Sequence, residues 1–380
     1  MDGLASASDT AIALYIHLPW CVQRCPYCDF NAHTQPDVLP ETSYVQALSD
    51  DLKAMQQRFG NKPIKSIFFG GGTPSLFSGK SIAKILQHVD ETLSIPKNCE
   101  ITLEANPGTL DNQRLLSFYQ AGVNRLSVGV QSFNNKHLKA LGRIHSFQQA
   151  LDAIKIAQNI PFKAINLDLM FGLPGQNYSE AMQDLSMAIQ LNPAHISWYE
   201  LTIEPNTYFA KHPPQRVESN IRADWMASGR DLLASAHYQH YEVSAFAQPN
   251  QQCQHNRWVW SFGDYWGIGA GAHSKQKTPA ASVRCVKQRH PLKYLKMPTK
   301  LQDHHHINQA DLPFEYLLNR LRLLSPIPWQ QARAFAGLTA EHPAIQSAIQ
   351  SGWLVSHLEN FQLTESGQWF IDEILSLFLN

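Results

Sequence analysis

The chain has 380 residues, of which 44% are hydrophobic and 16% are charged, and its length suits one barrel-sized domain with a smaller one. Its 31 basic and 31 acidic side chains balance, so no net charge directs it to nucleic acid or to an anionic membrane. No apolar run approaches the roughly 20 residues that a membrane span needs, and residues 1–20 lack the basic start and apolar core of a signal peptide. We therefore expect a cytoplasmic protein without a nucleic-acid partner.

Short apolar or β-branched runs alternate with longer amphipathic segments from residue 12 to about residue 205. This alternation predicts a parallel α/β sheet with helical crossovers. The expected strands are residues 11–18, 64–71, 100–107, 123–130, 163–172 and 195–202, and residues 42–59 are a typical helix of the series. Six βα units can close partly into a barrel or wind doubly into an open sheet, and the pattern alone does not separate the two.

Thiols, glycines and carboxylates follow the expected strands at their carboxyl ends. A cysteine cluster comes after the first strand, the sequence GGGTPS begins at the end of the second, and Glu104 lies at the end of the third. Gln131 follows the fourth strand, and Asp168 lies on the fifth. The loops after the carboxyl ends of parallel strands form the site in both architectures, so we expect these residues to share one site.

Cys21, Cys25 and Cys28 lie in a single loop, which indicates a metal site rather than a disulfide framework. One interpretation is a zinc site completed by His33. The other is a cubane iron-sulfur cluster with three protein thiolates, which leaves one iron open to a substrate. Zinc modules usually bring two separated pairs of ligands, so the single loop favours the iron-sulfur cluster.

The CxxxCxxC spacing, with Tyr27 before the third cysteine, resembles the radical S-adenosylmethionine (SAM) superfamily. Over nearly the whole chain, proteins similar to oxygen-independent coproporphyrinogen III oxidase share the motifs YIHLPWCVQRCPYCDF, FFGGGTPS, TLEANPGT, RLSVGVQSF, LGRIHS, NLDLMFGLPGQ and GIGAGAHS. The resemblance implies a partial (β/α)6 TIM-like barrel, with a [4Fe-4S] cluster on the three cysteines and SAM at the open iron. It also implies the residues around SAM: Tyr15, Tyr27, Gly71, Gly72, Thr73, Glu104, Gln131, Arg143 and Asp168.

Within this branch, Phe30 occupies a position where the decarboxylating oxidases have a further cysteine. Those oxidases also carry a long arm ahead of the first strand, where this sequence has about a dozen residues. Both departures match the sister group of HemW heme chaperones, which bind heme and deliver it to heme-requiring proteins. That group has an HNxxYW motif, and residues 255–260 read HNRWVW, with Val259 in place of the tyrosine. The resemblance implies that His255 binds heme.

Residues near this motif offer further heme contacts. Cys253 is an alternative thiolate ligand, and His273 could belong to either the SAM side or the heme side. Trp258 and Trp260 could stack on a porphyrin, and the basic run of residues 284–300 could pair with its propionates.

We expect two domains, with the barrel and the HNRWVW segment in residues 1–300 and a winged-helix-like helical domain in residues 301–380. The polar residues 301–310, which include three histidines at 304–306, are expected to form a solvated linker. From residue 301 on, three arginines stand against eight acidic residues, which disfavours DNA binding by the winged helix.

The leading hypothesis is a heme chaperone that binds a [4Fe-4S] cluster, SAM and heme, and transfers heme to acceptor apoproteins. Respiratory proteins are candidate acceptors, and a transient contact with a membrane protein is compatible with such a role. The alternatives are an oxygen-independent coproporphyrinogen III oxidase and a zinc-stabilised adaptor. The sequence leaves open whether SAM is cleaved, whether the protein is an enzyme, and whether it is a monomer or a dimer.

Overall fold

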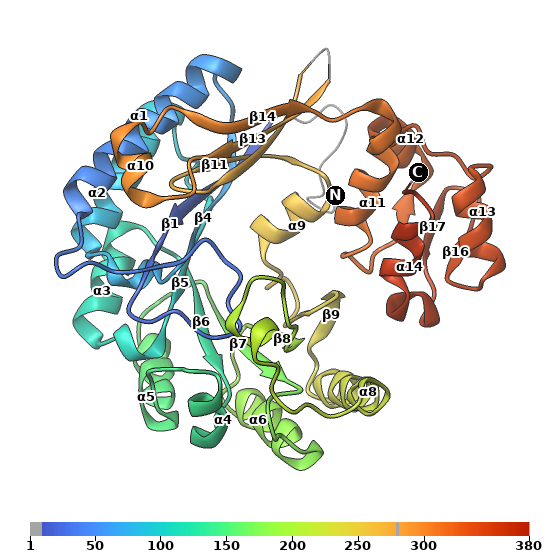
Figure 1. The fold of residues 1–380 in the computed structure, drawn as a ribbon, viewed down its shortest axis with the longest axis horizontal. Helices are drawn as coiled ribbons and strands as arrows, with labels where there is room; N and C mark the ends of the chain where they lie inside the picture. The colour runs from blue at the N-terminus through green and yellow to red at the C-terminus, as the bar shows by residue number, and fades with distance from the viewer. Residues whose placement is uncertain (1–9, 279–280, 380) are drawn as a thin grey trace.

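The computed structural model describes residues 10–278 and 281–379, which contain a large curved sheet and a smaller C-terminal domain (Figure 1). The large sheet has twelve strands in the order β14-β13-β12-β11-β1-β4-β5-β6-β7-β8-β10-β9. Its central parallel strands are β1 (Ile12–Leu18), β4 (Ile64–Gly71), β5 (Glu100–Ala105), β6 (Arg125–Gln131), β7 (Ala164–Phe171) and β8 (His195–Glu200). These strands confirm the six that the sequence pattern predicts.

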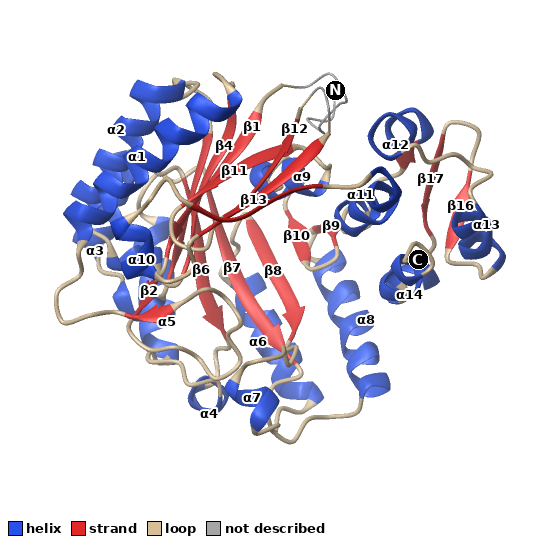
Figure 2. Cartoon of the chain, turned by 45° about the horizontal axis from the view of Figure 1, so that its top comes forward, coloured by secondary structure: helices blue, strands red, loops and turns tan. Residues whose placement is uncertain are grey.

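Helices connect these strands and cover the outer side of the curved sheet (Figures 1 and 2). They are α1 (Glu41–Phe59), α2 (Gly79–Leu93), α3 (Asn112–Ala121), α4 (Asn135–Ala140), α5 (Phe147–Gln158), α6 (Tyr178–Gln190), α7 (Tyr208–Lys211) and α8 (Ser219–Ser235). Local sequence fixes where several begin, because capping boxes start α5 at Ser146 and α6 at Asn177. The six central strands follow chain order without reversal, so the fold is a partial barrel and not a doubly wound sheet.

Strands that the sequence pattern did not predict extend the sheet at both edges. β11 (Asp264–Ile268) pairs in parallel with β1, and the antiparallel strands β12 (His273–Lys277), β13 (Ser282–Lys287) and β14 (Leu301–His306) follow it. At the other edge, β10 (Ala245–Ala247) and β9 (Gln239–Glu242) run antiparallel to their neighbours. The short strands β2 (Trp20–Cys21) and β3 (His33–Thr34) pair beside the cysteine loop. Helix α9 (Gln254–Trp260) precedes β11, and helix α10 (Pro291–Lys296) lies between β13 and β14.

The expectation of a linker at residues 301–310 is wrong for its first part, because residues 301–306 form strand β14. β14 is the edge strand of the large sheet, and its histidines are exposed. A solvated edge strand needs no apolar face, so composition alone makes it look like a linker. The large sheet therefore extends six residues beyond the expected domain boundary.

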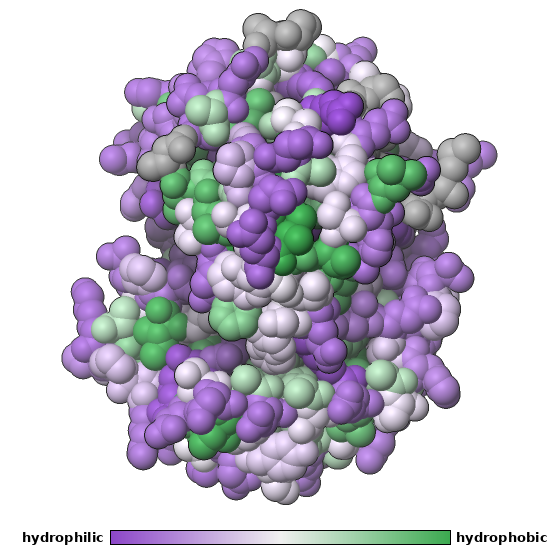
Figure 3. All heavy atoms as spheres, turned by 90° about the vertical axis from the view of Figure 1, so that its right-hand side faces the viewer, coloured by the Kyte–Doolittle hydropathy of each residue, from purple (hydrophilic) through white to green (hydrophobic). Residues whose placement is uncertain are grey.

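The C-terminal domain has its own hydrophobic core, separate from that of the barrel. Its helices are α11 (Leu312–Arg320), α12 (Trp329–Ala336), α13 (Pro343–Gln350) and α14 (Ile371–Ser376), and its strands are β15 (Ile327–Pro328), β16 (Leu354–Ser356) and β17 (Asn360–Leu363). The three strands form an antiparallel sheet in the order β15-β17-β16, which matches the expected winged-helix-like arrangement. The outer face of this domain is mostly hydrophilic, with apolar groups in small separate patches (Figure 3).

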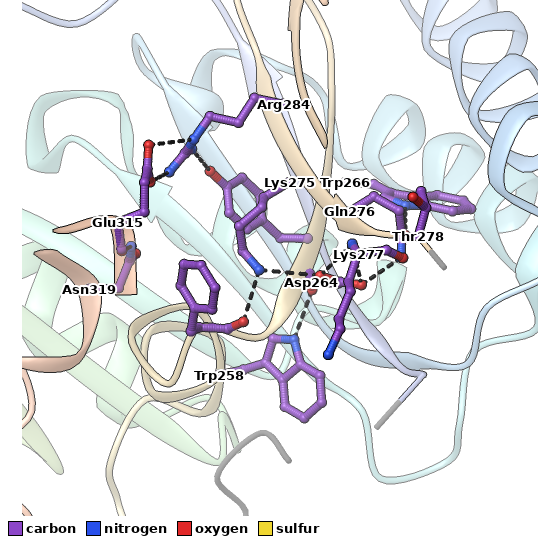
Figure 4. Close-up of polar contacts among 12 residues, drawn as sticks. Trp258, Asp264, Trp266, Lys275, Gln276, Lys277, Thr278, Arg284, Glu315 and Asn319 are labelled. Atoms are coloured by element: carbon purple, nitrogen blue, oxygen red, sulfur yellow. Dashed lines mark hydrogen bonds and ion pairs between the residues drawn. The ribbon is translucent and has the colours of Figure 1, made fainter. Parts of the chain in front are cut away.

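Phe262, which follows α9, packs into the core of the C-terminal domain and so connects it to the barrel. The Lys275 ammonium on β12 donates hydrogen bonds to the Phe262 carbonyl oxygen at 2.8 Å and to Asp264 Oδ1 at 3.2 Å (Figure 4). Among the described residues, no helix is long and apolar enough to cross a membrane.

Candidate functional site

The cysteine loop leaves the carboxyl end of β1 through β2, and its three thiols are free. Burial, followed by the neighbouring thiols of Cys28 and Cys25, raises the pKa of Cys21 to about 11. A guanidinium nitrogen of Arg143 lies 3.7 Å from Cys25 Sγ.

In residues 10–278 and 281–379, no three His, Cys, Asp or Glu side chains are grouped closely enough to hold a single metal ion. The His33 imidazole lies 3.3 Å from Asn31 Oδ1 and packs against His290, while the His33 carbonyl oxygen accepts from the Cys21 thiol. The side chain of His33 thus has other partners in Asn31 and His290, which disfavours the zinc interpretation. A cubane cluster binds each thiolate through a different iron, so three cysteines in one loop suit it.

Behind the cysteine loop, β1 and β4 approach each other closely at the sequence GGG. A Cβ atom on Gly71, whose φ is +121°, would lie 2.8 Å from His17 Cε1, and one on Gly72 would lie 2.5 Å from the Trp20 carbonyl oxygen. Only glycine therefore fits at these two positions without displacing the His17 side chain of β1 or the Trp20 backbone of β2. The Gly71 N–H donates to Glu104 Oε2 at 3.3 Å, which places the carboxyl group of β5 beside this loop.

The ring of His17 is held in one tautomer by its two neighbours. Its Nε2 lies 3.0 Å from the Asn31 carbonyl oxygen, which only accepts, so Nε2 carries the proton. Its Nδ1 must then accept from the Tyr15 hydroxyl, 3.0 Å away. Burial lowers the pKa of His17 to about 4, which keeps the ring neutral. Tyr15 is fixed at the barrel mouth through this chain of hydrogen bonds.

Two half-buried carboxyl groups, Glu104 on β5 and Asp168 on β7, lie on strands that are separated by β6. Burial, with a smaller effect of Asp168, raises the pKa of Glu104 to about 8. Burial also raises the pKa of Asp168, against the hydrogen bonds that it accepts from Asn166 at 2.7 Å and Ser127 at 3.0 Å. A carboxyl group with a raised pKa can pair with a ligand cation or donate a hydrogen bond when protonated.

We expect Glu104→Gln to reduce the pH dependence of stability of the ligand-free protein. Between about pH 4.5 and pH 8 the folded state keeps a proton on Glu104 that the unfolded state has lost. The folded state then binds more protons, so this group makes the free energy of unfolding fall as pH rises, by up to about 1.4 kcal/mol per pH unit. Urea unfolding at pH 5.5 and pH 7.5 should show a smaller decrease in the variant. The exposed control Glu359→Gln should keep the wild-type decrease. A wild-type decrease in Glu104→Gln as well would contradict the expectation.

The remaining expected site residues surround the same barrel mouth. Gln131 has a φ of +68° at an irregularity in β6, and its Oε1 accepts from the Tyr199 hydroxyl at 3.0 Å. Arg143 donates to the Gly129 carbonyl oxygen at 2.9 Å. Tyr27 packs against Phe209, with ring centroids 6.5 Å apart, and the buried Thr73 donates its N–H to the Trp20 carbonyl oxygen at 2.8 Å.

A cavity of about 620 Å³ opens beside the barrel mouth, between the barrel, α9 and α11. Of the expected SAM-site residues, Tyr15, Gly71 and Glu104 line it, and His255, Val259 and Trp260 line it from α9. Its wall also includes Phe30, His273, Arg284, Arg289, Leu318, Asn319 and Arg322. Its volume lies in the range of small-molecule and cofactor sites. The structure thus brings the two motifs that the sequence separates by more than 150 residues into one cavity.

His255 is held in the cavity wall by two residues that the sequence analysis did not identify. The Glu100 carboxylate accepts hydrogen bonds from the backbone N–H groups of Gln254 at 3.1 Å and His255 at 3.0 Å, at the N-terminus of α9. The Ser66 hydroxyl lies 3.0 Å from His255 Nδ1. Burial, followed by Arg125, lowers the pKa of His255 to about 3, so the imidazole is neutral. The sequence offered one signal for Ser66, a polar residue at a buried position of the expected strand that became β4. A small polar residue in a strand is too common to single out.

Two of the sequence-based alternatives do not fit the structure. Cys253 is buried, its thiol points to Glu100 Oε1 at 3.6 Å, and it does not line the cavity. The basic run is also divided, because Lys287 forms a buried ion pair with Asp51 whereas Arg284 and Arg289 line the cavity. Burial lowers the pKa of His273, which lines the cavity beyond Gly271.

Comparison with known proteins places this geometry in a class. A sequence model of the radical SAM superfamily matches residues 15–188, which span β1 to α6. The fold of the whole chain resembles that of coproporphyrinogen III oxidase from Escherichia coli, a radical SAM enzyme, with a TM-score of 0.82, 19% sequence identity, and coverage of 97% of this chain and 90% of that one. Fold and cysteine loop together define a radical SAM protein.

Sequence similarity over the full length points to a narrower family within this superfamily. The heme chaperone HemW of Haemophilus influenzae is 46% identical over 375 residues, covering 97% of this chain and 98% of the relative. The heme chaperone HemW of Escherichia coli is 45% identical over 371 residues, with the same coverage. The chain belongs to the HemW family of heme chaperones. The radical SAM family implies a [4Fe-4S] cluster and SAM.

Proposed function

We propose that this protein is a heme chaperone, which binds heme in the cavity between the barrel, α9 and α11 and passes it to acceptor apoproteins. The observation that carries the proposal is the position of His255. It lies neutral and buried in the wall of the cavity that Tyr15, Gly71 and Glu104 also line. The full-length similarity to proteins named heme chaperones supports the same conclusion.

The barrel mouth suits the cluster and SAM. In this proposal Cys21, Cys25 and Cys28 would hold the [4Fe-4S] cluster, which would supply one-electron chemistry to SAM. The residues around SAM are Tyr15, Tyr27, Gly71, Gly72, Thr73, Glu104, Gln131, Arg143 and Asp168. Three features of the described structure support this set: the free thiols, the glycines that leave no Cβ beside the loop, and the half-buried carboxyl groups of Glu104 and Asp168, whose pKa values are raised.

His255 is the proposed axial ligand of heme iron. A neutral imidazole with a free ring nitrogen is a common heme ligand. Since Nδ1 faces Ser66, the Nε2 atom is the one available for iron. Val259 and Phe30 give the cavity apolar surface.

We expect Ser66→Ala to weaken heme binding through His255. An outer hydrogen bond fixes the tautomer and orientation of a ligating histidine, and its loss typically lowers affinity about 10- to 100-fold. The Soret band of the heme complex should shift as well, because the ligand field changes. Ser66→Thr should restore both properties in part. An unaltered spectrum and affinity in Ser66→Ala would contradict this positioning role.

The test of the proposed function is made on the anaerobically reconstituted protein. It should bind heme with a Soret band and transfer the heme to an apoprotein such as apocytochrome b562, and it should not turn over coproporphyrinogen III. Turnover of coproporphyrinogen III without heme binding would overturn the proposal in favour of the oxidase alternative. A protein with one zinc per chain and no iron would favour the adaptor alternative.

The acceptors and the cellular setting are further parts of the proposal. Heme-requiring respiratory proteins are the proposed acceptors, reached through transient contact with membrane-bound partners. We place the protein in the cytoplasm, which fits its six free cysteines. Sedimentation of the heme-loaded protein would distinguish a monomer from a dimer.

A further inference from the structure

The charges around the cavity are unequal. Arg284, Arg289 and Arg322 line it, whereas Glu104 is the single Asp or Glu among its described lining residues. The pKa of Glu104 is raised to about 8, so its carboxyl group is largely neutral near pH 7. The histidines of the wall, among them His17 and His255, are held neutral by burial. The cavity therefore presents net positive charge to a ligand.

The three arginines differ in how far their charge is already neutralised. The Arg284 guanidinium on β13 makes a two-atom ion pair with Glu315 on α11 and also donates to the Tyr265 hydroxyl at 3.2 Å (Figure 4). Arg284 connects the barrel to the C-terminal domain and has few N–H groups left to bind a ligand. In contrast, the Arg289 guanidinium has no ion pair with any carboxylate in the part of the chain that the structure describes. Its backbone is fixed, because its carbonyl oxygen accepts from Asn31 Nδ2 at 2.8 Å.

Contacts with its neighbours hold the Arg322 side chain in place, but not all of its N–H groups have hydrogen-bond partners. It follows α11, its guanidinium lies 4.6 Å from the centroid of the Trp260 ring, and one nitrogen contacts Glu242 Oε1 at 3.2 Å. Its Nε has no hydrogen-bond partner among the described residues. Stacking on Trp260 holds the planar group at the cavity wall, and the remaining N–H groups can bind a carboxylate.

We propose that Arg289 and Arg322 bind the propionate carboxylates of heme, which orients the porphyrin with its iron toward His255. This inference rests on the proposed function and adds to it the residues that select a porphyrin with free carboxylates. SAM also carries a carboxylate, so the test must separate the two sources of this group. Arginine suits the role because its fork of N–H donors matches a carboxylate.

The experiment compares hemin with hemin dimethyl ester, without SAM, in wild type, Arg289→Ala and Arg322→Ala, by absorbance titration. Wild type should bind hemin more tightly than the ester. Each variant should lose about 10- to 100-fold in hemin affinity and less than about twofold in ester affinity, since a charge-assisted hydrogen bond is lost only for the free acid. The exposed Arg333→Ala on α12 is the matched control and should bind both ligands as wild type does.

Each outcome separates the inference from the proposed function. Equal losses for hemin and ester, or unchanged hemin binding in both variants, would overturn the propionate assignment while heme binding by His255 stands. Failure of wild type to bind either ligand would overturn the proposed function and the inference with it. Circular dichroism of the variants confirms that a lost affinity does not come from unfolding.

Discussion

Cys25→Ala is expected to abolish the iron-sulfur cluster while leaving heme binding intact. Reconstituted wild type should contain about four irons and four sulfides per chain, and the variant should contain almost none, because a cubane held by three thiolates does not tolerate the loss of one. The variant removes a partly exposed thiol beside Arg143, so the fold should persist. Iron and sulfide analysis, together with the visible spectrum of the anaerobic protein, measures the effect.

Heme binding should survive in Cys25→Ala because none of the three cysteines lines the cavity of His255. The matched control is Cys285→Ala, which removes a buried thiol on β13 and should keep the full cluster content. Retention of four irons by Cys25→Ala would refute the assignment of the cluster to this loop. Parallel loss of heme would show instead that the cluster is needed to form the heme site.

His255→Ala is expected to remove the axial ligand of heme. The Soret band should shift and weaken, and affinity should fall by at least about 100-fold, because an iron–imidazole bond is lost and the apolar contacts remain. Titration of the anaerobic protein with hemin measures both quantities. The substitution also leaves the buried Ser66 hydroxyl without its hydrogen-bond partner. The free energy of unfolding should therefore fall by about 1 to 3 kcal/mol.

The control for this variant is His240→Ala, which removes a half-buried neutral imidazole, stacked on Phe246 outside the cavity. It should bind heme as wild type does. If His255→Ala keeps the wild-type Soret band, a different side chain ligates the iron, and His273 on the same wall would be the next residue to replace. Cluster content should be unaffected in both histidine variants.

Local sequence patterns were sufficient to predict the strands of the central barrel. Each of its strands is a short apolar run followed by a turn and an amphipathic helix, and both signals arise within a window of about 20 residues. The edge strands lacked such signals. β14 is polar because it is exposed, and β11 is short and pairs with β1, which lies about 250 residues earlier in the chain. Pairing over that distance depends on the completed barrel, which no local pattern describes.

The sequence by itself determined the cysteine loop, the glycine-rich loop and the family, because these depend on residue type and spacing along one short segment. Only the tertiary structure decided how the loops meet. It placed His255 and Glu104 in the wall of one cavity, turned the Cys253 thiol toward Glu100, and divided the basic run into a buried Lys287 and a cavity-lining Arg289. Those outcomes follow from burial and side-chain direction, which arise when β11, α9 and α11 close on the barrel.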